Sequence, residues 1–310
     1  MTGQQWRNLL VASGLAALTI GSGVPAQAGA GTRQPTAEVD WAQVEEALEA
    51  RGQLMPGDVF RIGMPRSDLD VAVEGVPVKP GFALGSYAAF RQMGDALDVM
   101  VMGDLVLLDE EVPQVMAGLF AGGLSLTALH NHLNQVSPTS CISITWGAAS
   151  RSHWRRPSTE DSQLAGPPSR ERPRARLPRP RRSISQPSRR SWAVGRLQAG
   201  DVFQVNVPRA ETIREMGTEL LPAMGVVTVL NFQPTDDGSA ATTGDFVLTE
   251  SEVNLVASTL LANGIELTAL HNHGLADEPR LFYIHFWATG DLVRLAQGLR
   301  AALDQTNSQS

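Results

Sequence analysis

The chain of 310 residues is 43% hydrophobic and 18% charged, with a formal net charge of −7 at pH 7. These values describe a globular chain with room for about two domains, and they exclude collagen-like, coiled-coil and polytopic membrane proteins. The charge is uneven, because residues 151–190 hold twelve arginines and three acidic residues, a net charge of +9, which leaves −16 for the rest. This asymmetry must be explained before a partner is inferred from charge.

Residues 1–28 have the pattern of a secretory signal peptide. Arg7 is the only charged side chain before an apolar run at 9–20, and Ala26 and Ala28 form a small-x-small cleavage site. The run is too short to span a bilayer, and no cysteine follows it directly to carry a lipid. We therefore expect a secreted or periplasmic protein of the cell envelope with no stable membrane anchor.

Motifs that recur along the chain predict a tandem duplication. Gly-Asp-Val-Phe occurs at 57–60 and 200–203, and Thr-Ala-Leu-His-Asn-His occurs at 127–132 and 268–273. The two copies are therefore about 142 residues apart.

Each copy is predicted to have strands first and helices late. Segments of the first copy that are rich in β-branched and apolar residues are typical of strands; they lie at 58–64, 69–73, 82–90 and 99–108. Acidic residues at 109–111 favour the start of a helix. The second copy has a matching helix at 250–261, then a strand at 280–287 and a last helix at 291–303.

The predicted fold class is α+β, a tandem duplication of one mixed strand and helix domain built mainly on antiparallel sheet. The first repeat domain is assigned to 40–135 and the second to 193–304.

The segment at 136–192 interrupts the duplication. After His132 the first copy should continue like residues 274–299, but the chain instead becomes rich in Arg, Pro and Ser. Three interpretations are open: a disordered linker, a nucleic-acid or membrane tether, and a stretch of gene translated out of frame.

The genetic code favours the third interpretation. If each codon from Pro138 onward starts one base earlier, a run compatible with residues 280–299 appears, and residues 184–192 become a run that matches 40–48. We therefore expect a disordered segment at 136–192, a truncated first copy without its last strand and helix, and no nucleic-acid partner.

Histidines supply the candidate site. Two imidazoles in a His-x-His motif lie on one face of a strand, and a third from a neighbouring strand completes a metal site with an open position. The predicted ligands of a divalent metal such as zinc are His271, His273 and His285, assisted by Glu278, with His130 and His132 as an incomplete set in the first copy.

Strand register decides whether His285 joins this site. If His285 pairs with Ala269, it shares a face with His271, whereas a slip of one residue turns it away.

Other roles for these polar residues remain open. The histidines and Asn272 can instead hold a turn through hydrogen bonds, and Asp104 and Asp245 can be turn residues or can orient an imidazole.

Two arginines have two possible roles. Arg66 and Arg209, each after a proline, can bind a carboxylate or phosphate, or form an ion pair with Asp68 or Glu211. The single cysteine, Cys141, excludes an intramolecular disulfide and a thiolate metal cluster.

The motifs together resemble the LppY/LpqO-like family of bacterial secreted proteins and lipoproteins. The resemblance rests on Gly-Asp-Val-Phe, on Met-Gly-Asp-Leu-Val-Leu at 102–107, on both His-Asn-His motifs and on the sequence at 278–287. It implies export, a duplicated domain and no established activity. The chain departs from the family in lacking a lipid-anchor cysteine and the Tyr-x-His strand of the first copy.

The function predicted from the sequence is an exported protein that binds a metal or small polar ligand through its histidines, with hydrolase or lyase chemistry. The alternative is a non-catalytic, envelope-associated binding or structural protein whose histidines are internal supports. The sequence assigns no oligomeric state.

Overall fold

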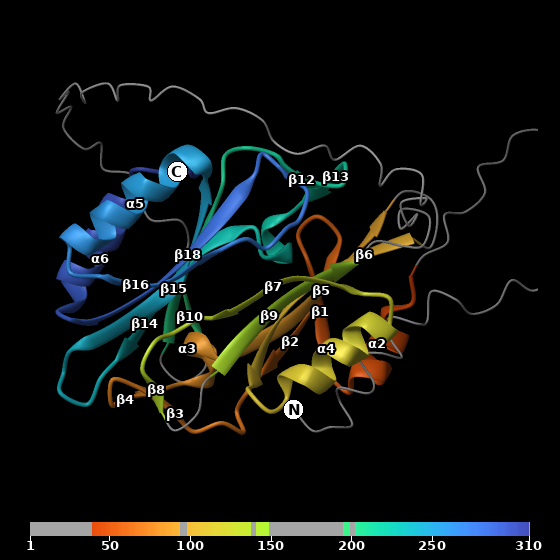
Figure 1. Cartoon of the computed structure of the whole chain (residues 1–310), viewed down its shortest axis with the longest axis horizontal. Coiled ribbons are helices and arrows are strands. Elements are labelled where there is room, and N and C mark those ends of the chain that lie inside the picture. The colour runs from red at the N-terminus through yellow and green to blue at the C-terminus, as the bar shows by residue number, and fades with distance from the viewer. Residues whose placement is uncertain (1–38, 94–97, 138–140, 149–194, 199–201, 310) are drawn as a thin grey trace, which may run out of the picture.

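The computed structural model describes residues 39–93, 98–137, 141–148, 195–198 and 202–309. The predicted signal peptide and most of the basic segment lie outside these ranges. The described chain forms two six-stranded antiparallel sheets, one in each repeat, with helices at the two ends of the molecule (Figure 1). The predicted α+β class is confirmed.

The two large sheets have the same strand order. In the first repeat the order is β1 (Gly52–Met55), β2 (Val59–Pro65), β5 (Gly85–Met93), β6 (Asp98–Leu108), β9 (Cys141–Ala148), β7 (Ser125–Asn131). In the second it is β10 (Gly195–Gln198), β11 (Val202–Pro208), β14 (Val227–Pro234), β15 (Ala240–Thr249), β18 (Leu281–Gly290), β16 (Glu266–His271). This identity of order supports the predicted duplication.

Two small antiparallel sheets complete the β structure. One contains β3 (Val71–Val73), β4 (Val76–Val78) and β8 (Val136–Ser137), and the other contains β12 (Ile213–Glu215), β13 (Thr218–Leu220) and β17 (Asp277–Glu278).

Helices cover one face of each large sheet. They are α2 (Trp41–Leu48) and α4 (Val112–Ala121) in the first repeat, and α5 (Glu250–Ala262) and α6 (Leu292–Leu303) in the second; α3 (Pro80–Ala83) and η3 (Pro222–Met224) are single turns. Capping side chains fix where α2, α5 and α6 begin, because they satisfy free backbone N–H groups. Asp40 accepts from the backbone of Ala42, and Thr249 with Glu252 forms a capping box.

The predicted end of the first repeat at residue 135 needs a correction. Cys141–Ala148 is strand β9, paired on one side with β6 and on the other with β7, so the large sheet keeps its fifth strand. The residues at 141–148 alternate β-branched or aromatic residues with small ones, which suits a strand. The prediction of disorder therefore fails for this stretch, and residues 149–192 lie outside the described chain. A smaller correction is that Phe82 belongs to the turn α3 and not to a strand.

The repeats share apolar clusters across their boundary. Met100 and Met102 of the first repeat pack with Val247 and Tyr283 of the second in one cluster. In another, the small sheet of the first repeat and Leu133 pack against Trp287. The two sheets are therefore held together by a common core, and hydrogen bonds such as Gln233 Nε2 to the Pro77 carbonyl (2.6 Å) cross the same boundary.

Each repeat contains one buried arginine in an equivalent place. Arg66 is bound by Asp68 and Glu111, and Arg209 by Glu211 and Glu252. Each guanidinium also donates to a backbone carbonyl of the strand before the helix. The ion-pair alternative for the two arginines is therefore confirmed, and they join a strand end to the start of a helix.

No helix among the residues described here is long and apolar enough to cross a membrane.

We expect Arg209→Ala to destabilise the fold strongly. The change leaves Glu252, which is 7% exposed, without its cationic partner, and breaking a buried ion pair costs about 3–5 kcal/mol. The measurement is the free energy of unfolding in urea. Arg51→Ala is the matched control, because it removes an exposed Arg–Glu pair with Glu45 and should leave the urea midpoint nearly unchanged. Equal shifts of the urea midpoint in the two variants would contradict a stabilising role for the buried Arg209 ion pairs.

Candidate functional site

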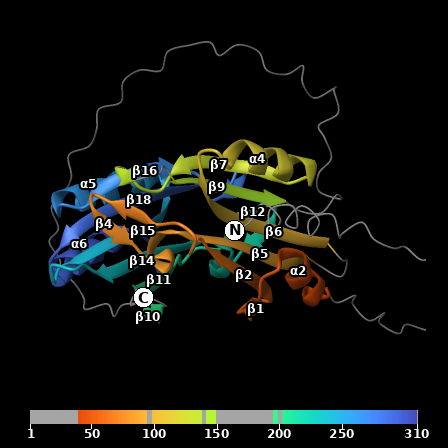
Figure 2. The same ribbon diagram turned by 90° about the horizontal axis from the view of Figure 1, so that it is seen from below.

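The His-x-His motifs of the two repeats lie beside each other. His130 is in β7 and His271 ends β16, while His132 and His273 follow just after these strands. Strands β7 and β16 are the last strands of their sheets, and they contact each other (Figure 2). Thr268 Oγ1 donates to the backbone carbonyl of His132 across this contact, at 2.6 Å. The edges of the two sheets therefore bring four histidines together.

The fifth histidine comes from the neighbouring strand. His285 pairs with Ala269 of β16 on one side and with Asp245 of β15 on the other. This is the register in which His285 shares a face with His271, so that possibility, left open by the sequence, is the one observed. A β-bulge between Leu267 and Ala269 adjusts β16 just before the histidines.

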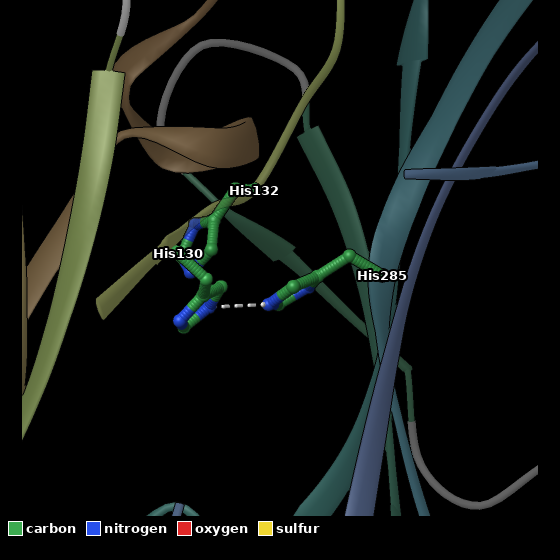
Figure 3. Close-up of side chains that lie close together, drawn as sticks. All are labelled: His130, His132 and His285. Atoms are coloured by element: carbon green, nitrogen blue, oxygen red, sulfur yellow. Dashed lines mark hydrogen bonds between the residues drawn. The ribbon is translucent and has the colours of Figure 1, made fainter. Parts of the chain in front are cut away.

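The imidazole rings are in close contact. The ring centroids of His130 and His271 are 3.5 Å apart, and those of His132 and His285 are 4.2 Å apart. His273 in turn stacks on Tyr283 at 3.6 Å. Figure 3 shows His130 and His132 facing His285 from the other repeat. The cluster thus contains every histidine of the two motifs together with His285.

Hydrogen bonds orient the ring of His285. Its Nδ1 lies 2.9 Å from the carbonyl oxygen of Gly244, so Nδ1–H donates and Nε2 is left to face the cluster. His130 Nε2 lies 3.2 Å from His285 Nε2. Because His285 Nε2 has no proton in this assignment, His130 Nε2–H is the donor.

A carboxylate from each repeat lies next to the rings. His132 Nε2 is 3.5 Å from Asp104 Oδ2, and His273 Nε2 is 3.8 Å from Asp245 Oδ2. Asp245 Oδ1 is also 3.7 Å from His285 Nδ1. The two aspartates occupy equivalent positions in β6 and β15. They lie next to the imidazoles, which is one of the roles that the sequence left open, and they are not turn residues.

Several buried polar atoms of the site have no hydrogen-bond partner among the described residues. They are His130 Nδ1, His132 Nε2, His271 Nε2, His273 Nε2 and Asp245 Oδ1. Buried polar groups in proteins are nearly always paired, so this concentration of unpaired atoms makes the cluster a candidate site for water, an ion or a small ligand.

Burial favours the neutral form of four of these histidines. It lowers the pKa of His271 to about 4, that of His273 to about 3 and that of His130 to about 2, assisted by the charges of neighbouring histidines. The pKa of His285 is also well below its usual value for the same reasons. Neutral imidazole is the form that binds metal ions.

The two aspartates differ in their protonation. Burial raises the pKa of Asp245 well above its usual value, and the charge of Asp104 raises it further. For Asp104, burial also opposes ionisation, but the interaction with the nearby His132 outweighs burial and lowers the pKa. The site thus combines one ionised carboxylate with one that holds its proton more tightly.

Glu278, predicted to assist the second-copy histidines, is not in the cluster. It is exposed in β17, opposite Arg214 of β12. Its neighbour Asp277 is buried and binds the backbone of Leu281 and the side chain of Arg280. The sequence placed this acid near His285 because the two are close along the chain, but the hairpin turns it into the small sheet.

The first repeat has no histidine at the position of His285. Thr145 of β9 pairs with Asp104 and Ala128, as His285 pairs with Asp245 and Ala269. The cluster is therefore asymmetric, with three histidines from the second repeat and two from the first.

Sequence reasoning missed that the site is shared between the repeats. It assigned a complete site to the second copy and an incomplete one to the first. The available signal was the position of each His-x-His motif near the end of an edge strand, which can meet its copy once the sheets pack together. Two sets of potential ligands have atoms within 4.8 Å of one another: His130, His132 and His285, and Asp245, His271 and His285.

The fold and site together define a duplicated antiparallel α+β protein with a composite, histidine-rich polar site that can hold a metal ion. The chain belongs to the family described as Domain of Unknown Function (DUF1259), whose model matches residues 42–149 and 193–305. The two matched ranges agree with the duplication. No curated protein matches the chain, and no solved structure does.

The depressed histidine pKa values predict acid-sensitive folding in the metal-free protein. The usual pKa is 6.5 and that of folded His271 is about 4, so the unfolded chain binds protons first as the pH falls. The contribution of the histidines to the free energy of unfolding should be constant above pH 6.5 and should fall below it, by at most roughly 2 kcal/mol per buried histidine at pH 5. Urea denaturation with a chelator present measures this.

His271→Asn removes one of these groups, so it should reduce the slope. A urea midpoint that does not change between pH 7 and pH 5 would contradict the buried, neutral state of the cluster.

Proposed function

We propose that the protein binds a divalent transition metal, zinc in the first instance, at the composite site, with His130, His132 and His285 as ligands. The single observation that carries the proposal is the convergence of these three side chains, whose potential ligand atoms lie within 4.8 Å of one another. The ligands come from both repeats, so the bound ion would join the two sheets.

The separation of the nitrogens fits such an ion. Zinc–nitrogen bonds of about 2.0–2.1 Å in tetrahedral geometry put two ligand nitrogens roughly 3.4 Å apart. His130 Nε2 and His285 Nε2 are 3.2 Å apart. An ion can therefore replace the hydrogen bond between the rings with little movement, provided that His130 adopts the tautomer with its proton on Nδ1.

The second set of potential ligands shares His285, which has only one nitrogen to offer. Since His285 Nδ1 donates to Gly244, Nε2 alone can bind an ion. The sets are thus alternatives around one histidine. We assign the ion to His130, His132 and His285, because imidazole ligands suit zinc, copper, iron and nickel and because Asp245 tends to keep its proton.

Three protein ligands leave a position open for water or a small polar ligand, as in catalytic zinc sites. A metal there would supply Lewis acidity, which supports hydrolase or lyase chemistry as the predicted activity. The chain's own residues hold the ligands in place: the Gly244 carbonyl orients His285, and Asp104 faces His132 at 3.5 Å. Such outer contacts fix the orientation of metal-binding imidazoles.

The rival function, a non-catalytic protein with structural histidines, is less well supported. Internal supports should have their hydrogen bonds satisfied, whereas His132, His271 and His273 each have a buried nitrogen without a partner in the described chain.

We expect purified protein to bind one zinc ion, and we expect His130→Gln and His285→Gln each to weaken that binding by at least about 100-fold. The loss of a direct ligand should exceed the 10- to 100-fold effect of losing an outer contact. Elemental analysis after dialysis and calorimetric titration with zinc, copper and nickel measure stoichiometry and affinity. Circular dichroism verifies that the variants fold.

His130→Gln also separates the composite site from a site confined to the second repeat. A second-repeat site of His271, His273 and His285 would keep its affinity in this variant, which would contradict the composite assignment. His153→Ala is the matched control, because His153 is the sixth histidine of the chain and belongs to neither motif. It should bind zinc as the unmodified protein does.

We also propose that the protein is exported to the periplasm or beyond, by cleavage after Ala28. The support is the apolar run and small-x-small motif of residues 1–28. Expression in a bacterial host, with intact-mass measurement of the product, should give a chain that begins at Gly29. Ala28→Arg should block cleavage, and a mature protein that retains Met1 would contradict the proposal.

A further inference from the structure

The second repeat has an open apolar groove on the helix-covered face of its sheet. The groove has a volume of about 560 Å³ and is lined by strand residues Phe203, Val205 and Phe232 and by helix residues Leu292 and Ala296. Phe203 is 43% exposed and Leu292 is 52% exposed. Large apolar side chains exposed together on one surface usually mark a place where something binds.

The equivalent strand face of the first repeat is covered by a helix. Phe60 and Phe90 pair across β2 and β5 as Phe203 and Phe232 pair across β11 and β14. Helix α2 lies over the first pair, with the Trp41 ring stacked on Phe60 at a centroid distance of 4.9 Å. Phe60 is consequently only 6% exposed.

We propose that the groove of the second repeat is the binding site for an amphipathic helix with the apolar pattern of α2. The stretch of chain just before β10 would supply this helix when its sequence carries that pattern. The duplication argues for this occupant, because the corresponding stretch before β1 provides α2. Strand β1 pairs with β2 as β10 pairs with β11. The first pairing starts at Gly52 with Ile62, and the second starts at Gly195 with Val205.

The sequence present before β10 does not carry the pattern. The positions that correspond to Trp41, Val44 and Leu48 are 184, 187 and 191, where the chain has Ile, Pro and Ser. Proline in a helix interior removes a hydrogen bond and clashes with the preceding turn. Translated one base earlier, residues 184–192 become a run that matches 40–48, one residue out of the register that β1 and β10 set, so the out-of-frame hypothesis would supply a helix close to this place.

The experiment installs the helix in the full chain. Residues 184–191 are replaced by the sequence of α2, which includes Ile184→Trp, in a Cys141→Ala background that carries Ala296→Cys as a reporter in the groove. We expect the thiol to react with a maleimide about tenfold more slowly than in the ungrafted reporter protein. The midpoint of thermal unfolding should rise by about 4 °C.

The control graft is identical except that position 184 carries Ile184→Ser, which removes the aromatic ring that should stack on Phe203. Its thiol should react almost as fast as in the ungrafted protein. If the grafts misfold, a synthetic peptide of residues 39–50, added to the ungrafted reporter protein, should slow labelling saturably, and the same peptide with Trp41→Ser should not.

Equal labelling in the two grafts, or no protection by either graft or peptide, would overturn the proposal. So would an apolar small molecule that co-purifies with the protein and stays bound in the α2 graft by native mass spectrometry, because the groove would then belong to that ligand.

Discussion

The packing of the two sheets against each other through shared apolar clusters is the interaction on which the rest of the structure depends. Met100, Met102, Val247 and Tyr283 occupy one of these clusters, although they come from different repeats. Neither repeat can bury these side chains alone, and burial of apolar area is the main stabilising contribution to folding. The same packing sets the two edge strands side by side and so fixes the distances between the histidines.

The asymmetry of the cluster follows from one position in the penultimate strand. His285 and Thr145 occupy the same place in the register of their sheets. The apolar residues Ile142 and Ile144 of β9 are at the register positions of Phe282 and Ile284. Apolar alternation is enough to hold a strand in register, so β9 can keep its place in the sheet with a sequence that supplies no third histidine.

Much of the fold was predictable from the sequence, because it depends on patterns local to each copy. Recurring motifs predicted the duplication, and segments rich in β-branched and apolar residues predicted most of the strands. The ion pairs of Arg66 and Arg209 were also among the alternatives, since their partners lie two residues away.

The rest depends on contacts that no local pattern encodes. His130 and His285 are 155 residues apart, and only the packing of the sheets brings them together. Glu278 was misplaced for the opposite reason, because nearness along the chain does not determine which sheet a residue joins. The strand at 141–148 was missed because its residues do not repeat those of 280–287, the strand that the duplication predicts at this place.

If the proposed ion binds, the shared position of the histidines would give it a mechanical role in addition to any chemical one. An ion held by His130 and His132 on one side and His285 on the other resists separation of the repeats, and by thermodynamic linkage anything that separates them lowers its affinity. Metal occupancy would then report whether the two halves of the molecule are correctly docked. A chain with either half misfolded would release its metal before it lost the fold of the other half.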